Sequence, residues 1–278
     1  MSIIKCETCP RHCELAEGQV GFCRAREVRD GLIKCKNYGI VSSYALDPIE
    51  KKPLYHFHPG SKILSVGSFG CNMNCFYCQN YEISQLELDQ QDDRNYRAMT
   101  PVSIANDALD CTSKGNIGIA FTYNEPVVGW EFVCDTANEA KKRDLSTVMV
   151  TNGCFCENIL EELMIFIDAF NIDLKCFDEE GYKRLGGDFE TVKHTIERAA
   201  TWRHVEVTSL IVPGQNDSPE KMEEQAIWLA SISPDIPLHI SKYFPRWKAD
   251  MPETSLDLLY RLFDIAKKHL KYVHIGNV

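Results

Sequence analysis

Apolar residues follow two alternating patterns through most of this chain, from about residue 61 to residue 276. Short runs of consecutive apolar and β-branched residues, typical of strands buried on both faces, alternate with longer segments that are apolar every three or four positions. The runs predict strands at 62–66, 117–121, 147–150, 169–174, 205–212, 238–241 and 272–275. The longer segments predict helices at 104–114, 127–143, 157–167, 191–203, 219–231 and 255–270.

Two of the predicted helices begin with strong start signals. Thr100 precedes Pro101, and Ser218 precedes Pro219, so a capping hydroxyl stands before a proline in the first turn. Repeated strand–helix units predict a parallel sheet covered by helices. The units are too few for a complete eight-fold barrel, so the fold class expected is α/β, an open partial (β/α)6 barrel. Functional groups of such barrels gather at the carboxyl ends of the strands.

The first sixty residues have a different composition, rich in Cys, Gly and charged side chains. We therefore expect two parts, a Cys-rich metal-binding amino-terminal segment at 1–60 and a partial barrel at 61–278. The polar string LELDQQDDRNYR separates the barrel's first strand from its first long helix. That composition predicts a mobile or substrate-facing loop within 82–98.

Charge and cysteine content narrow the class of protein. The formal net charge of −10 argues against nucleic acid as the main partner, because such proteins usually carry a basic surface. No apolar run is long enough for a spanning helix or a secretory signal. Thirteen cysteines without an export signal favour metal ligands or reduced thiols over disulfides. The expected location is cytoplasmic.

Cys71, Cys75 and Cys78 form a C-x3-C-x2-C triplet in the string GCNMNCFYC, directly after the first predicted barrel strand. An iron–sulfur cluster used only for electron transfer is normally closed by four protein thiolates. Three thiolates leave one iron of a four-iron cluster open to a small molecule. The alternative is three reduced cysteines that are close together by chance.

Polar side chains follow the second and third predicted strands. Tyr123, Asn124 and Glu125 lie in AFTYNEP, where a carboxylate can accept charge-assisted hydrogen bonds from an ammonium group. A polar helix cap is the simpler interpretation of this string. Thr151 and Asn152, in VTNG, have short polar side chains suited to ribose or carboxylate contacts.

The later strands add further candidates. Asp173 and Lys175 stand two residues apart in NIDLK, so alternation directs both side chains to one face. A structural ion pair is the alternative to a ligand site there. Val212 follows the fifth predicted strand, and His239, in the sixth, is either a site residue or a buried core histidine.

The triplet resembles the cluster motif of the radical S-adenosylmethionine (SAM) superfamily, C-x3-C-x-aromatic-C, with Tyr77 at the aromatic position. The resemblance implies that the three cysteines hold a 4Fe–4S cluster whose fourth iron binds SAM. It also implies reductive cleavage of SAM to methionine and a 5′-deoxyadenosyl radical. SAM contacts are implied for Tyr77, Tyr123, Asn124, Glu125, Thr151, Asn152, Asp173, Lys175, Val212 and His239.

Longer strings look closest to the AmmeMemoRadiSam-system radical SAM enzymes, relatives of the pyruvate formate-lyase activating enzymes. They include CETCPRHC, GQVGFCRARE, DPIEKKPLYHFHPGSKILSVGSFGCNMNCFYCQNYEISQ and YVHIGNV. This resemblance implies Memo-type and AMMECR-type partner proteins and a one-electron reductant such as flavodoxin or ferredoxin.

Four further cysteines cluster near the amino terminus in the pattern C-x2-C-x3-C-x9-C. Four thiolates this close can hold a tetrahedral Zn²⁺ or a second 4Fe–4S cluster, and either would help a segment with little apolar surface to fold. Unligated thiols are the third alternative. The residues are Cys6, Cys9, Cys13 and Cys23.

Three functions are compatible with these patterns. The leading one is a radical SAM enzyme acting on a small molecule. The second is an activase that takes a hydrogen atom from a glycine of a partner enzyme. The third, from another class, is a non-catalytic iron–sulfur electron carrier, which would need neither an open iron nor polar groups on successive strand ends.

Overall fold

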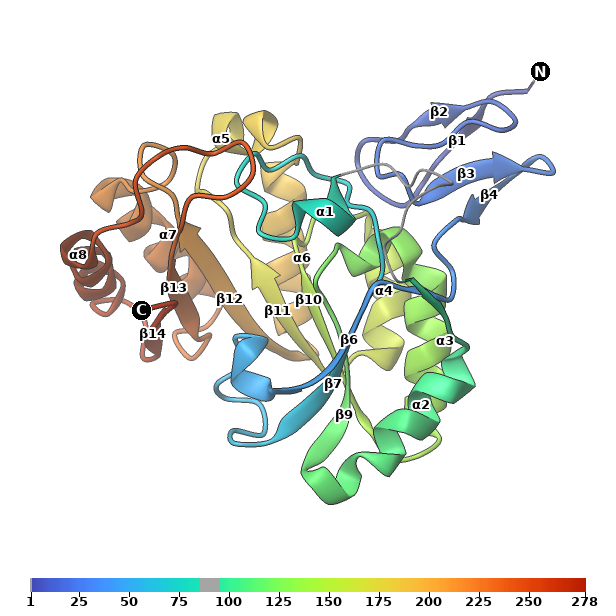
Figure 1. The fold of residues 1–278 in the computed structure, drawn as a ribbon. Helices are drawn as coiled ribbons and strands as arrows, with labels where there is room; N and C mark the ends of the chain where they lie inside the picture. The colour runs from blue at the N-terminus through green and yellow to red at the C-terminus, as the bar shows by residue number, and fades with distance from the viewer. Residues whose placement is uncertain (1, 86–95) are drawn as a thin grey trace.

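A computed structural model describes residues 2–85 and 96–278, so most of the loop expected at 82–98 lies outside the described residues. Within them, one sheet has the strand order β14-β13-β12-β11-β10-β9-β7-β6. Strands β7 to β14 in this sheet are parallel and lie in chain order, with helices on one side, as in an open partial barrel (Figure 1). The bounds are β6 Ser43–Pro48, β7 Lys62–Gly67, β9 Asn116–Phe121, β10 Ser146–Thr151, β11 Ala169–Asp173, β12 His204–Ile211, β13 Leu238–Lys242 and β14 Val273–Gly276. The predicted fold class and the seven predicted strands are confirmed.

The crossover helices also follow the prediction, with three differences. Helix α5 was not expected, the helix expected at 104–114 is divided into α2 and η2, and the helix expected at 127–143 is divided into η3 and α3. The division at 127–143 falls at Gly129, whose backbone leaves helical values at φ −124° and ψ 36°. Asn37 Oδ1 lies 2.6 Å from where a Cβ would stand, so only glycine fits there. The bounds are α1 Tyr81–Ser84, α2 Pro101–Asp110, η2 Thr112–Lys114, η3 Pro126–Gly129, α3 Trp130–Lys141, α4 Glu157–Phe166, α5 Glu179–Arg184, α6 Phe189–Ala200, α7 Pro219–Ile232 and α8 Leu256–Ala266. No helix among the described residues is long and apolar enough to cross a bilayer.

Both predicted helix starts are present. The Thr100 hydroxyl accepts a hydrogen bond from the Ser103 amide at 3.1 Å and closes a reciprocal capping box. The Ser218 hydroxyl accepts from the Lys221 amide at 3.2 Å. These bonds satisfy amide groups that the first turn leaves without partners, which is why the two crossovers begin at fixed positions.

The amino-terminal segment contributes to the central sheet. Strand β6 pairs with β7 in antiparallel register from Ser43 opposite Gly67 to Pro48 opposite Lys62. The sheet therefore continues across the boundary expected at residue 60, and the division into two parts remains a prediction. Two small hairpins that precede β6 lie beside the carboxyl ends of the parallel strands (Figure 1). A short ladder joins β5, which also precedes β6, to β8. Their strands are β1 Ile4–Lys5 with β2 Glu14–Leu15, β3 Arg26–Arg29 with β4 Leu32–Cys35, and β5 Ile40–Val41 with β8 Arg97–Ala98.

The opposite end of the barrel has a polar floor centred on Glu206, near the start of β12. Its fully buried carboxylate accepts hydrogen bonds from the amides of Tyr55 and His56, at 3.0 and 2.8 Å. The rings of His204 and His239 lie 2.9 and 2.6 Å from the same two oxygens. The chain that follows η1 (Ile49–Lys51) is thereby fixed across the amino-terminal ends of the strands.

Candidate functional site

The cysteine triplet lies in the loop that leaves β7, at the carboxyl end of the sheet. Strand β7 ends at Gly67. A Cβ there would stand 2.9 Å from the Tyr123 ring, so only glycine fits where the cysteine loop passes the loop that follows β9. Cys75 is buried, and Cys71 and Cys78 are half-buried. All three line one cavity of about 350 Å³. This volume falls in the range of pockets that enclose small-molecule ligands.

Asn124 holds the triplet loop against the second strand end. Its Oδ1 accepts from the Ser68 amide at 2.9 Å, and its Nδ2 donates to the Phe69 and Gly70 carbonyls at 3.1 and 3.2 Å. The Asn124 side chain therefore bonds an N–H group and two carbonyl groups of the backbone just before Cys71. Asn124 also lines the cavity, but most of its hydrogen-bonding capacity is already used to position the loop.

Glu125 is the buried carboxylate of the cavity. It is 4% exposed, and it accepts hydrogen bonds from Thr151 Oγ1 at 2.7 Å and from the amides of Val127 and Asn152 at 3.1 and 2.7 Å. Burial raises the pKa of Glu125 to about 7, although these three donors oppose the rise. A cationic ligand in the cavity would favour the ionised form.

Thr151 and Asn152 have different places at the end of β10. Thr151 points its hydroxyl at Glu125 and does not line the cavity, so it acts by positioning the carboxylate. Asn152 lines the cavity, and its Nδ2 lies 3.7 Å from Cys71 Sγ and donates to Asn72 Oδ1 at 2.8 Å. Thr151 thus contacts the Glu125 carboxylate, and Asn152 contacts the cysteine loop.

Asp173 and Lys175 form the expected pair at the end of β11. Lys175 Nζ lies 2.9 Å from Asp173 Oδ2, and both residues line the cavity. Burial alone would lower the pKa of Lys175, but the charge of Asp173 holds it well above its usual value. The pair supplies both signs of charge to one wall, which suits a ligand with an ammonium and a carboxylate.

Tyr77 and Tyr123 both line the cavity. Tyr77 is buried, and burial raises its pKa well above the usual value. Tyr123 has a left-handed backbone, φ +74°, and its hydroxyl donates to Asp47 Oδ2 at 2.7 Å. Lys52, buried directly after η1, donates to the same oxygen at 2.9 Å and lies 4.5 Å from the centre of the Tyr123 ring. The Asp47 and Lys52 pair was not expected, because Asp47 lies 76 residues before Tyr123 in the sequence.

Two of the candidate residues lie away from the cavity. Val212 is fully buried after β12, and its amide donates to Asn216 Oδ1 at 2.7 Å. His239 belongs to the floor and bonds Glu206, in agreement with the buried-histidine alternative. Alternation along the same two strands would have indicated the residues that do line this wall. They are Thr208, Leu210 and Ser241, together with Asn277 after β14.

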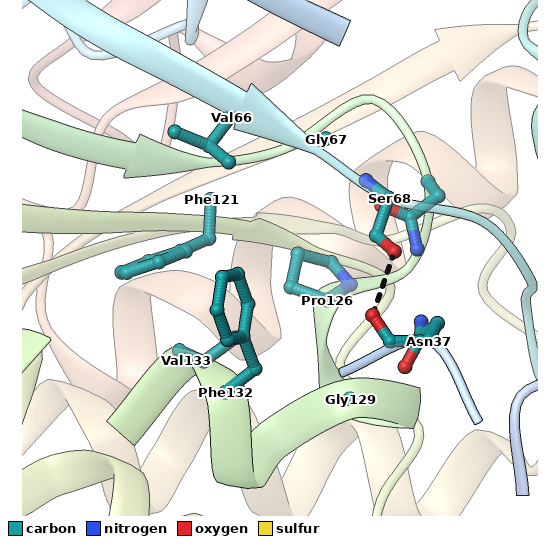
Figure 2. A pocket seen from close by; sticks show the side chains of 10 residues that line it. Asn37, Val66, Gly67, Ser68, Phe121, Pro126, Gly129, Phe132 and Val133 are labelled. Carbon is teal, nitrogen blue, oxygen red and sulfur yellow. Dashed lines mark hydrogen bonds between the residues drawn. The ribbon is translucent and has the colours of Figure 1, made fainter. Parts of the chain in front are cut away.

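A second, smaller cavity of about 20 Å³ lies behind the Asn124 turn, between the ends of β7 and β9 and helix α3. Figure 2 shows Phe121 and Phe132 beside it and the hydrogen bond of 3.4 Å from Ser68 Oγ to the Asn37 carbonyl. It has room for no more than a water molecule. The larger cavity beside the triplet, by contrast, has room for a small-molecule cofactor.

The residues around the larger cavity fit a site-differentiated cluster with a zwitterionic ligand. Three thiols, a carboxylate and an ion pair line this one cavity. Within residues 2–85 and 96–278, no three His, Cys, Asp or Glu side chains are close enough to hold a single ion. A four-iron cluster is larger than one ion and accepts a wider separation of thiolates. Burial raises the pKa of Cys75 to about 11, so cluster assembly must displace its proton.

This arrangement is typical of enzymes that place a nucleoside cofactor beside an incompletely ligated iron–sulfur cluster. The chain belongs to the Radical SAM superfamily, whose family model matches residues 65–226, more than half of the sequence. Membership implies a 4Fe–4S cluster and SAM as cofactors.

The relatives are diverse. An uncharacterized protein of Methanocaldococcus jannaschii is 39% identical over 99% of this chain and 81% of its own length. The 4-hydroxyphenylacetate decarboxylase activating enzyme of Clostridioides difficile is 23% identical over 69% of this chain and 56% of its own length. Among solved structures, a radical SAM methyltransferase from Sphaerobacter thermophilus has a TM-score of 0.61 at 16% identity, covering 79% of this chain and 67% of that one. A domain of the pyruvate-formate lyase-activating enzyme from Bacteroides vulgatus has a TM-score of 0.50 at 21% identity, covering 58% and 99%. The structural likenesses support the fold alone.

Proposed function

We propose that this chain is an enzyme that cleaves SAM reductively and applies the resulting radical to a small-molecule substrate. The observation that carries the proposal is the single cavity lined by Cys71, Cys75, Cys78, Glu125, Asp173 and Lys175. A 4Fe–4S cluster held by the triplet would supply the electron that breaks the sulfonium C–S bond and yields the 5′-deoxyadenosyl radical. The protein's own residues have the tasks of binding, orienting and shielding.

The charged residues suit the methionine end of SAM. Glu125 has its oxygens held by three donors and is placed to accept from the SAM ammonium. Lys175 can bind the SAM carboxylate, while Asp173 keeps the lysine charged and oriented. Thr208, Leu210 and Ser241 remain for the adenosine or the substrate.

The proposal extends to a biological setting. Membership in the AmmeMemoRadiSam system, with Memo-type and AMMECR-type partners and flavodoxin or ferredoxin as reductant, is supported by the long sequence strings that resemble that system. Assignment to the cytoplasm is part of the same proposal. Glycyl-radical-enzyme activation is the second candidate, favoured by the activating enzyme among the relatives.

The test is anaerobic incubation of the reconstituted, dithionite-reduced chain with SAM, followed by quantification of 5′-deoxyadenosine. We expect product from the wild type and none from the variant in which the three triplet cysteines are replaced by alanine. A fully loaded protein that forms no product would favour the electron-carrier alternative. Electron paramagnetic resonance of a mixture with a candidate partner enzyme separates the two catalytic alternatives, because an activase leaves a stable glycyl radical.

A further inference from the structure

Outside the cavity, four cysteines of the amino-terminal hairpins meet in a second place. They line one small apolar space closed on the barrel side by Asn72 and Val128. All four are free thiols, and the turn between the first two strands is closed by a 2.9 Å hydrogen bond from the Cys6 amide to the Cys13 carbonyl. We call these residues the tetracysteine group: Cys6, Cys9, Cys13 and Cys23.

A buried cation without a full set of partners lines the same space. The Arg26 side chain is 6% exposed, and one of its terminal nitrogens bonds Glu131 at 2.6 Å. Its Nε is buried and has no hydrogen-bond partner. A buried N–H without an acceptor is costly, and the Glu131 carboxylate, which bonds a terminal nitrogen, leaves Nε without one. Metal-bound thiolates or sulfides would provide that acceptor.

We propose that the tetracysteine group holds a second 4Fe–4S cluster, closed by four thiolates. Zinc would require four sulfurs at about 2.3 Å from one point. No three His, Cys, Asp or Glu side chains in the described part of the chain are close enough to hold a single ion, and this is true of the tetracysteine group as it is of the triplet, which the superfamily uses for a four-iron cluster. A closed cluster has no iron free for SAM, so its chemistry is limited to one-electron exchange and to stabilising the fold.

The tetracysteine group is in direct contact with the triplet loop. The Cys71 amide donates to the Cys23 carbonyl at 3.2 Å. Between them, Gly70 has φ +90°, and a Cβ there would stand 2.4 Å from the Cys23 oxygen, so the two backbones meet at van der Waals distance. Asn72 lines the tetracysteine space and accepts from Asn152, which reaches Cys71. Two clusters so placed would be coupled magnetically and electronically.

The experiment uses the full-length chain with all three triplet cysteines changed to serine, reconstituted anaerobically with iron and sulfide. We expect about four irons and four sulfides in this variant and about eight of each in the wild type. The complementary variant, with the tetracysteine group changed to serine, should fall by half in the same way. Cys35→Ser, in the neighbouring hairpin but outside the space, is the matched control and should keep the wild-type content. Iron counting does not require SAM cleavage, so its failure and that of the proposed function are distinguishable.

Two results would overturn the inference. They are one zinc without sulfide in the triplet-free variant, and no iron in that variant while the wild type binds four. A milder substitution covers the case in which serine variants do not fold. In the chain with all its cysteines intact, Arg26→Lys should lower the midpoint potential of one of the two clusters by removing the Nε donor, whereas Arg29→Lys, exposed on the same strand, should leave both potentials unchanged. An equal potential in both would exclude a cluster beside Arg26.

Discussion

The sharpest test of the cavity is the isosteric substitution Glu125→Gln. It keeps the side-chain volume but replaces one acceptor oxygen with an NH₂ group and removes the charge. Oε1 accepts from the Thr151 hydroxyl and the Val127 amide, and Oε2 accepts from the Asn152 amide. Whichever oxygen becomes the NH₂, it faces at least one backbone N–H, and the ammonium of SAM loses its anionic partner.

The magnitude follows from the charge of that contact. A hydrogen bond to a charged group contributes about 1.5–3 kcal/mol, so the SAM dissociation constant should rise by about 10-fold to 100-fold. Isothermal titration of the reconstituted protein under anaerobic conditions measures this directly. Glu223→Gln, an exposed carboxylate on α7, is the control and should leave the affinity unchanged.

The pH dependence gives the same prediction an independent check. Because burial raises the pKa of Glu125 to about 7, the free site loses its negative charge as pH falls through 7. Wild-type affinity for SAM should weaken in that range, and the affinity of the glutamine variant should not follow this trend. If Glu125→Gln binds SAM within about two-fold of the wild type at pH 8, the carboxylate does not contact the ligand and the placement of SAM is wrong.

Three further predictions concern the wall, the sheet and the floor. Lys175→Met should weaken SAM binding about 10-fold or more in the same titration and leave Asp173 unpaired, whereas the exposed Lys183→Met should have no effect; equal affinities would refute the contact. Gly118→Ala should lower the free energy of unfolding by about 4 kcal/mol or more, because its Cβ would stand 1.8 Å from a backbone oxygen of β10; an unchanged melting temperature would contradict that packing. Burial would raise the pKa of Glu206, but hydrogen bonds from two histidines and two amides outweigh it and lower this pKa to about 2. Ionised Glu206 therefore stabilises the fold at pH values above about 4.5, the pKa of the unfolded side chain. That contribution, about 3 kcal/mol, is lost as pH falls from about 4.5 towards 2. Denaturation curves should therefore show Glu206→Gln to be destabilised at pH 7 and progressively less so below pH 4.5, and a pH-independent difference would rule this out.

Much of the barrel was predictable because its signals are local. Apolar runs located the parallel strands, and a hydroxyl before proline located two helix starts at Thr100 and Ser218. The antiparallel strand β6 was not predicted, since its alignment depends on β7 and its own sequence is too mixed to indicate a strand. Long-range pairing of this kind leaves no periodic signal in a short segment.

The site was predictable where chemistry and strand alternation coincide. Asp173 and Lys175 lie two residues apart and share a wall, as alternation requires. His239 is on the inward face as well, but one layer deeper, where Glu206 binds it and Ser241 takes its place at the cavity. Sequence alternation indicates the face of a strand and not the depth along the barrel, so this distinction needed coordinates.

The polar floor also shapes the cavity. Pro53 forms part of the cavity wall, and its carbonyl accepts from Asn171 Nδ2 at 2.8 Å, just ahead of the amides that Glu206 holds. The polypeptide of the floor therefore covers the base of the cavity at Pro53.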